Sequence, residues 1–206
     1  MNMGVRPLVA SDVDAVGLAL ARSFERDPFF SWLYGEGALR RLNRSFRAQL
    51  RVQFVPRGLA YTTDARQGAA IWSAPGRGVL PTFWESVRMA PAHLHFLPPA
   101  QMRRALRAFA AMDSHHPDEP HVHLSLLGVD PRYQRTGIGR ALLNEGLSRA
   151  NAVSMPVYLD TANPDNVPYY EGFGFRIVCE FDFPSGGPHS WGMLRRASVE
   201  DPRSPS

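Results

Sequence analysis

The segment Gln134-Arg135-Thr136-Gly137-Ile138-Gly139 is the most informative in the chain, because it joins a β-rich stretch to a helical one. Glycine at positions 137 and 139 allows torsions and close backbone approaches that other residues resist. The helix that follows would present free N–H groups and the positive end of its dipole to an anion. A pyrophosphate suits such a helix start, and Arg135 and Arg140 could add contacts to its oxygens.

Two glycines alone also fit a helix start that needs glycine only for packing, so the motif by itself leaves both interpretations open. A P-loop is excluded, because it requires a lysine after its last glycine and the chain contains none. A dinucleotide-binding fingerprint would require a small residue where Leu142 stands.

Strands and helices alternate on both sides of this motif. Downstream of residue 120 we expect strands over 121–129 and 155–160, helices over 137–152 and 167–171, and a final strand pair over 176–183 and 190–195. Upstream we expect a strand over 5–9, a helix capped by Ser11 and ending near Asp27-Pro28, a helix over 38–55, a hairpin over 58–62 and 68–73, and a helix over 100–112. This order predicts one α/β domain over residues 1–196 with a sheet of mixed direction, followed by a disordered tail over 197–206.

The composition limits the classes of function. The 206 residues suit one globular domain, and no apolar run is long enough to span a membrane. All 23 basic residues are arginines spread along the chain, and the net charge is only +4, which disfavours a nucleic-acid partner. Cys179 is the only cysteine, which excludes an internal disulfide and predicts a reducing, cytoplasmic location. Because Cys179 lies in an expected strand, we expect it to be buried in a core and not to act as a nucleophile.

At this point the sequence resembles the GNAT superfamily of acyl-CoA-dependent N-acyltransferases. The superfamily's pattern of Gln or Arg, two residues, Gly, one residue, and Gly or Ala matches Gln134 to Gly139, and its second signature matches residues 166–175. Within the superfamily, the stretches 128–139, 159–175 and 190–193 are similar to puromycin N-acetyltransferase and its relatives. The resemblance implies a mixed, largely antiparallel central sheet of about seven strands flanked by helices, in which the strand before the motif splays from its neighbour.

The resemblance also implies where acetyl-CoA would bind as cosubstrate. Backbone groups of Leu127 and Val129 would hold the pantetheine arm in the gap between the strands, and Asn166 would contact the cofactor. The pyrophosphate would lie on the turn formed by Gln134, Arg135, Thr136, Gly137, Ile138, Gly139 and Arg140.

Three residues receive catalytic roles by the same resemblance. The N–H of Leu127 would stabilise the oxyanion of the tetrahedral intermediate. Tyr170 would protonate the departing thiolate, with Tyr169 as the core residue beside it. His123, four residues before Leu127 and therefore expected on the same strand face, would remove the proton of the amine, although a strand histidine without a role is equally consistent with the sequence.

Other signals are discounted. His115, His116, His121, His123 and the pair His93 and His95 are interpreted as loop histidines, and no metal is expected. Trp32, Trp72 and Trp84 are expected in the core or in the wall of an acceptor pocket.

The expected function is direct transfer of an acetyl group from acetyl-CoA to a primary amine of a small molecule, such as an aminonucleoside. A catalytically silent acyl-CoA-binding regulatory module and an arginine-rich nucleic-acid binder remain as alternatives. We expect no membrane partner, and a homodimer is left open.

Overall fold

A seven-stranded sheet forms the centre of the protein. The computed structural model describes residues 4–75 and 99–197. The strands are β1 (Val5–Pro7), β2 (Ala60–Thr63), β3 (Gly68–Ser73), β4 (Val122–Val129), β5 (Val157–Thr161), β6 (Arg176–Asp182) and β7 (His189–Arg195). Their order is β1-β2-β3-β4-β5-β7-β6, and only the β4–β5 pair is parallel. The prediction of a mixed, largely antiparallel sheet of about seven strands is confirmed.

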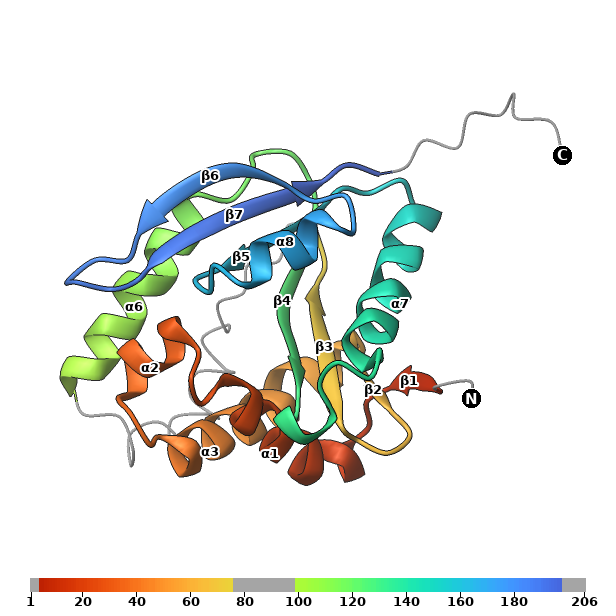
Figure 1. The fold of residues 1–206 in the computed structure, drawn as a ribbon, viewed down its shortest axis with the longest axis horizontal. Helices are drawn as coiled ribbons and strands as arrows, with labels where there is room; N and C mark the ends of the chain where they lie inside the picture. Colours follow the sequence, from red (N-terminus) through yellow and green to blue (C-terminus); the bar gives the residue numbers. More distant parts are fainter. Residues whose placement is uncertain (1–3, 76–98, 198–206) are drawn as a thin grey trace, which may run out of the picture.

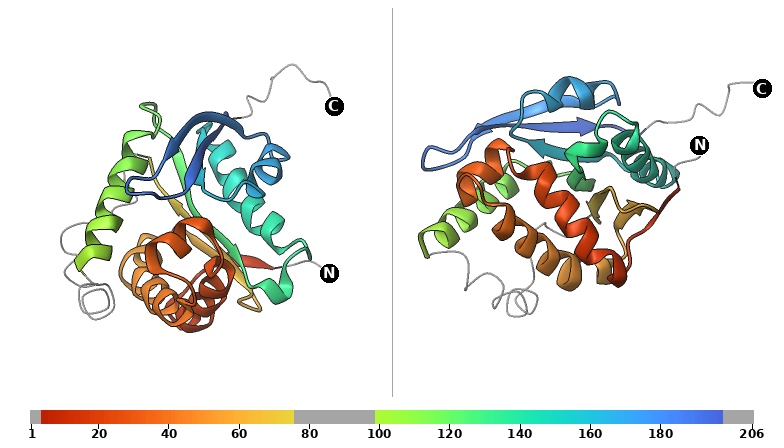
Figure 2. Two further views of the ribbon diagram at one scale, coloured as in Figure 1. Left: turned by 60° about the vertical axis from the view of Figure 1, so that its left-hand side comes forward. Right: turned by 60° about the horizontal axis from the view of Figure 1, so that its bottom comes forward.

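Helices cover both faces of this sheet (Figures 1 and 2). The helical elements are η1 (Ala10–Asp12), α1 (Val13–Phe24), α2 (Pro28–Tyr34), α3 (Leu39–Gln49), η2 (Leu50–Phe54), α4 (Val55–Arg57), α6 (Pro99–Ser114), η3 (Pro131–Tyr133), α7 (Ile138–Ala152) and α8 (Asn166–Glu171). Helices α1 and α7 both contact β3 and β4 but lie on opposite sides of them. In the described part of the chain no helix is both long and apolar enough to cross a membrane.

Strand β3 separates two hydrophobic cores, because all six of its residues are buried and their side chains alternate. Ala69 and Ile71 belong to the core beneath α1 and α3. Ala70 and Trp72 belong to the core beneath α7. The sheet is therefore a central layer between two helical layers, and α7 is held firmly against it.

Two helix boundaries near the N-terminus differ from the prediction. Ser11 is not an N-cap but lies within η1, and Asp12 Oδ2 instead accepts the N–H of Val9 at 3.0 Å. The first helix ends at Phe24, and Asp27 starts a separate helix α2 by accepting the N–H groups of Phe29 and Phe30. Asp27 followed by Pro28 at the first helical position is a signal for the start of a helix. The prediction instead treated these two residues as the end of the preceding helix.

The parallel pair β4–β5 is joined only at its beginning. Its paired positions are Val122 with Val157 and His123 with Tyr158. From Leu124 onward β4 pairs, among the described residues, with β3 alone. The splayed strand implied by the resemblance is thus present, and it opens a gap at the centre of the sheet.

Some predictions fall outside the described residues. These are the placement of Trp84, the pair His93 and His95, and almost all of the tail over 197–206. The remaining predicted strands and helices are present, with boundaries displaced by only a few residues.

Candidate active site

Helix α7 begins at the predicted anion-binding turn. Gly137 occupies its N-cap with a left-handed φ of 90°, and no side chain caps this end. The first bond of the helix runs from the N–H of Ala141 to the carbonyl of Gly137 at 3.0 Å. The N–H groups of Ile138, Gly139 and Arg140 therefore have no acceptor within the helix and can receive the oxygens of an anion.

Side chains around this turn hold its shape instead of reaching toward a ligand. Gln134 donates through Nε2 to the carbonyl of Val129 at 3.1 Å, and Thr136 donates to the carbonyl of Tyr133 at 2.7 Å. Arg135 is exposed and adopts a left-handed φ of 61°. The Arg140 guanidinium lies 5.1 Å from the centre of the Phe173 ring.

Val129 directs its main-chain groups into the gap between β4 and β5. Its N–H donates to Ser23 Oγ of α1 at 3.2 Å, while its carbonyl accepts from Gln134. Alternate residues of a strand point their N–H groups to the same side, so the N–H of Leu127 faces the same gap. The sequence did not indicate Ser23, because α1 and β4 are distant in the sequence and meet only in the folded protein.

A cavity extends from this gap beneath helices α1 and α2. Leu127, Asn166 and Tyr170 line it, and so do the carboxylates Asp27 and Asp160. Asn166 donates through Nδ2 to Thr161 Oγ1 at 3.1 Å. The structure therefore brings three of the predicted site residues together at one cavity, and it adds two acidic groups that were not predicted.

Of the two adjacent tyrosines, Tyr170 is the buried residue and Tyr169 is the more exposed one. Tyr170 is 8% exposed and lines the cavity, whereas Tyr169 is 37% exposed and packs near Gly139. The assignment of Tyr169 as the core residue is therefore wrong. Burial raises the pKa of the Tyr170 phenol, and the neighbouring Tyr169 and Asp27 raise it further, so Tyr170 is protonated at neutral pH.

His123 does not share a face with Leu127. A register shift between Ile71 and Trp72 inserts one extra residue into β4. Both Leu124 and Leu127 consequently pack into the core beneath α7, and His123 points to the opposite side. Simple alternation along the strand failed because of this bulge.

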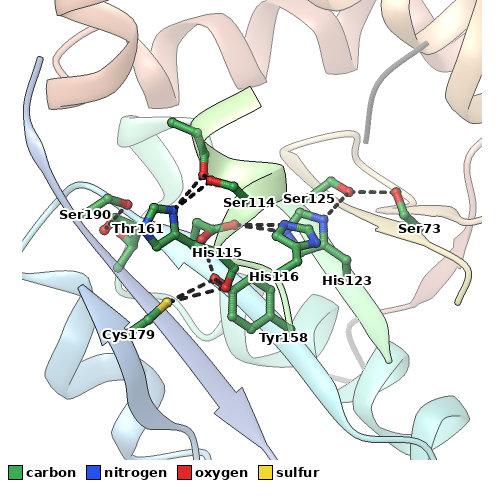
Figure 3. Close-up of polar contacts among 12 residues, drawn as sticks. Ser73, Ser114, His115, His116, His123, Ser125, Tyr158, Thr161, Cys179 and Ser190 are labelled. Atoms are coloured by element: carbon green, nitrogen blue, oxygen red, sulfur yellow. Dashed lines mark hydrogen bonds and ion pairs between the residues drawn. The ribbon is translucent and has the colours of Figure 1, made fainter. Parts of the chain in front are cut away.

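Asp160 connects His123 with the cavity (Figure 3 shows the surrounding residues). Its Oδ2 lies 3.5 Å from His123 Nε2 and 3.4 Å from His116 Nε2, while Tyr158 donates to its Oδ1 at 2.7 Å. His123 Nδ1 lies 3.4 Å from Ser125 Oγ, which is 2.9 Å from Ser73 Oγ. A chain of polar atoms thus runs from the cavity wall into the sheet.

Neighbouring charges and burial have opposite effects on the pKa values of Asp160 and His123. The contacts with His116, His123 and Tyr158 lower the pKa of Asp160 to about 2, although burial alone would raise it. Burial lowers the pKa of His123 more than Asp160 raises it, and the neighbouring His116 and His121 lower it further. His123 is therefore neutral near pH 7 and can accept a proton.

The clustered histidines were expected to lie in a solvated loop, but they contact other residues of the fold. His116 and His123 are largely buried, and together with Asp160 they could offer three ligand atoms within 4.8 Å of one another. His115 stacks on Phe181, and His121 Nδ1 contacts the Glu119 carbonyl. The absence of a metal from the reaction stays a prediction.

Cys179 lies where the sequence did not place it, whereas Trp72 and Trp32 pack in or against the hydrophobic cores as predicted. Cys179 is only half-buried, 3.6 Å from Tyr158 Oη, so the prediction of a buried core cysteine is wrong. Trp72 is in the core beneath α7, and Trp32 packs on Phe183. Among the described residues that line the cavity, neither tryptophan is present.

The chain is similar in sequence to known acetyltransferases. A family model described as "Acetyltransferase (GNAT) family" matches residues 65–175, which is more than half of the chain. A mycothiol acetyltransferase of Acidothermus cellulolyticus is 39% identical over 66 residues. That match covers 31% of this chain and 20% of the relative, so the chain spans only a small part of that protein.

Solved structures share the whole fold. A Corynebacterium glutamicum protein described as histone acetyltransferase HPA2 and related acetyltransferase matches with a TM-score of 0.72 and 21% identity, covering 98% of this chain and 99% of its own. Arylalkylamine N-acetyltransferase 2 of Aedes aegypti matches with a TM-score of 0.65 and 12% identity, covering 95% and 99%. At these identities the likeness concerns the fold alone.

Proposed function

Because the chain belongs to the GNAT acetyltransferase family, we propose that it transfers an acetyl group from acetyl-CoA to a primary amine of a small molecule. One observation carries the proposal. The gap between β4 and β5 has the uncapped start of α7 at one end and the cavity with Tyr170 at the other. Acetyl-CoA would bridge these two ends.

Acetyl-CoA would bind mainly to main-chain groups. The pyrophosphate would accept hydrogen bonds from the N–H groups between Arg135 and Arg140. The pantetheine arm would lie along Leu127 and Val129 and displace the bond from Val129 to Ser23. Asn166, at the start of α8, would contact the arm from the other side of the gap. Gln134 would contribute by holding the turn in place.

The reaction would proceed in one ternary complex. The neutral amine attacks the thioester carbonyl, and the N–H of Leu127 stabilises the oxyanion that forms. Collapse of the tetrahedral intermediate breaks the C–S bond, Tyr170 gives its proton to the departing thiolate, and the second proton that the attacking nitrogen loses restores the Tyr170 phenol. Because Tyr170 is protonated at neutral pH, it is in the state that this step requires.

His123 would receive the proton that the ammonium loses before attack. His123 is not among the described residues that line the cavity, but Asp160 is. Asp160 Oδ2 lies 3.5 Å from His123 Nε2, so a proton could pass from the cavity to His123 through this carboxylate or a water beside it. This route replaces the direct contact that the sequence predicted.

A thiol-release assay with a panel of primary amines tests the proposed function. The panel should include an aminonucleoside, because the resemblance to puromycin N-acetyltransferases favours such an acceptor. The assay should contain a chelator, since we expect no metal to take part, and no added reductant, since the released thiol of coenzyme A is what is measured. Amine-dependent thiol release supports acetyl transfer. Binding of coenzyme A without any turnover would instead identify a silent acyl-CoA-binding module.

A further inference from the structure

The cavity wall is unusually rich in aromatic rings. Phe24, Phe29, Phe30, Phe46, Phe109 and Phe183 all line it, and they come from α1, α2, α3, α6 and the segment after β6. Ring centres are 4.9 Å apart for Phe24 and Phe30 and 4.8 Å apart for Phe29 and Phe183. Such rings provide a large apolar surface and no partner for polar substituents.

The charged groups on the described wall are all acidic. Asp27 and Asp160 line the cavity, and none of the chain's many arginines is among its described lining residues. Both hydrogen bonds that Asp27 accepts within the described residues end on Oδ1, which leaves Oδ2 available to a ligand. Burial raises the pKa of Asp27, and a bound ammonium would lower it again.

Asp27 lies close to the reaction centre. It lines the same cavity as Leu127 and Tyr170, the residues proposed to stabilise the oxyanion and to protonate the thiolate. An ammonium that contacts Asp27 would therefore wait beside the thioester, while the rest of the molecule lies among the phenylalanines. A carboxylate on the same molecule would face Asp27 or Asp160 and be repelled.

We infer that the acceptor is a hydrophobic monoamine, an alkyl or arylalkyl primary amine with a single positive charge and no carboxylate. This inference rests on the proposed function and specifies the substrate class of the same site. Amino acids and peptide N-termini are disfavoured by their acidic or polar groups. Polyamines are disfavoured because His116, His123 and Tyr158 already contact Asp160, so a second ammonium would lose its water among the aromatic rings.

A homologous series of amines tests the apolar part of this inference. Burying one methylene group is worth about fourfold in affinity at 25 °C. We expect kcat/KM to rise by about that factor per methylene from ethylamine to hexylamine, and 2-phenylethylamine to be a better substrate than ethylamine. A flat or falling series would overturn the inference.

Two matched pairs test the charge requirement. 2-Phenylethylamine and phenylalanine differ only in the carboxylate, and we expect about 100-fold lower kcat/KM for phenylalanine. Butylamine and putrescine differ by a second ammonium, and we expect putrescine to be the poorer substrate. Preference for phenylalanine or putrescine would contradict the proposed acceptor class.

Substitutions in the cavity wall test whether these side chains determine the preference for hydrophobic amines. Asp27→Asn keeps a good N-cap for α2 but removes the charge, so KM for hexylamine should rise about tenfold while coenzyme A affinity is unchanged. Asp14→Asn, at an exposed carboxylate paired with Arg47 and Arg51, is the control. Phe109→Ala should reduce the hexylamine-to-ethylamine ratio, and Leu106→Ala on the exposed side of the same helix should not.

Calorimetry separates failure of this inference from failure of the proposed function. Amines are titrated into the complex of the protein with coenzyme A, so no turnover is needed. Tighter binding of hexylamine than of ethylamine supports the acceptor class even if no amine is acetylated. Equal binding of the two amines, or no binding of either, would overturn it even if some other amine is a substrate.

Discussion

Tyr170 and Tyr169 are neighbours in the sequence, yet α8 gives them different surroundings. Only Tyr170 lines the cavity, while Tyr169 is partly exposed beside the start of α7. General acids typically contribute 100-fold or more to a rate. We therefore expect Tyr170→Phe to lower kcat by about 100-fold without changing coenzyme A affinity, as measured by steady-state kinetics and calorimetry.

Tyr169→Phe is the matched control for this prediction, because it removes the same hydroxyl from the adjacent residue. It should retain most of the activity. A Tyr170→Phe enzyme as fast as the parent would mean that another group or water protonates the thiolate.

His123 leads to a prediction about pH. Burial, His116 and His121 lower its pKa below the ordinary value of about 6.5, despite the opposing effect of Asp160. A base must be unprotonated, so kcat/KM should be constant near pH 7 and should fall only well below pH 6.5. The pH–rate profile of His123→Gln should lack this acidic limb, and an unchanged limb would remove His123 from the proton route.

At the scale of elements, close packing of α7 against β3 fixes the position of the anion-binding turn. A Cβ atom added to Gly146 would lie 2.0 Å from the Trp72 ring, whereas one added to Gly139 would lie 3.3 Å from Tyr169 Oη. Gly146→Ala should therefore lower the free energy of unfolding by about 1–3 kcal/mol, as measured by urea denaturation.

Gly139→Ala, a substitution in the same helix, serves as the comparison. It should leave the stability unchanged or raise it slightly, because alanine favours a helix over glycine. Equal stability losses in both variants would contradict the packing of α7 against Trp72.

The sequence predicted the elements well where local signals are strong. The glycines of the turn, the apolar periodicity of α7 and the alternation in the final hairpin depend on nearby residues only. The bulge in β4, which reverses the face of His123, depends on pairing with β3 and was invisible in the sequence. The acidic groups Asp27 and Asp160 reach the cavity through contacts between distant segments, and for the same reason they were not predicted.

At the scale of the whole molecule, paired carboxylates make stability depend on pH. Bonds from Arg6 and Arg66 lower the pKa of Asp12, and bonds from Arg132 and Arg22 lower that of Asp130. A carboxylate with a lowered folded-state pKa contributes stability above its unfolded value near 3.9, and this contribution disappears as pH falls through the folded value.

The unfolding free energy should therefore decrease as pH falls below 4, as measured by denaturant unfolding at several pH values. His123, whose folded pKa is also lowered, should cause a further loss that begins as pH falls through about 6.5. Asp130→Asn, which removes one carboxylate contribution, should weaken the dependence below pH 4. A stability that rises on acidification would contradict these ion pairs.

The uncapped start of α7 should bind the pyrophosphate of coenzyme A, and calorimetric titration of the purified chain with coenzyme A measures this binding. We expect saturable binding that is about tenfold weaker in Gly137→Ala, because the left-handed φ of 90° at this position disfavours any side chain. Gly186→Ala, a change at another left-handed glycine with open space around it, should bind as the parent does. No heat of binding for the parent protein, under conditions where it is folded, would show that this turn does not bind coenzyme A.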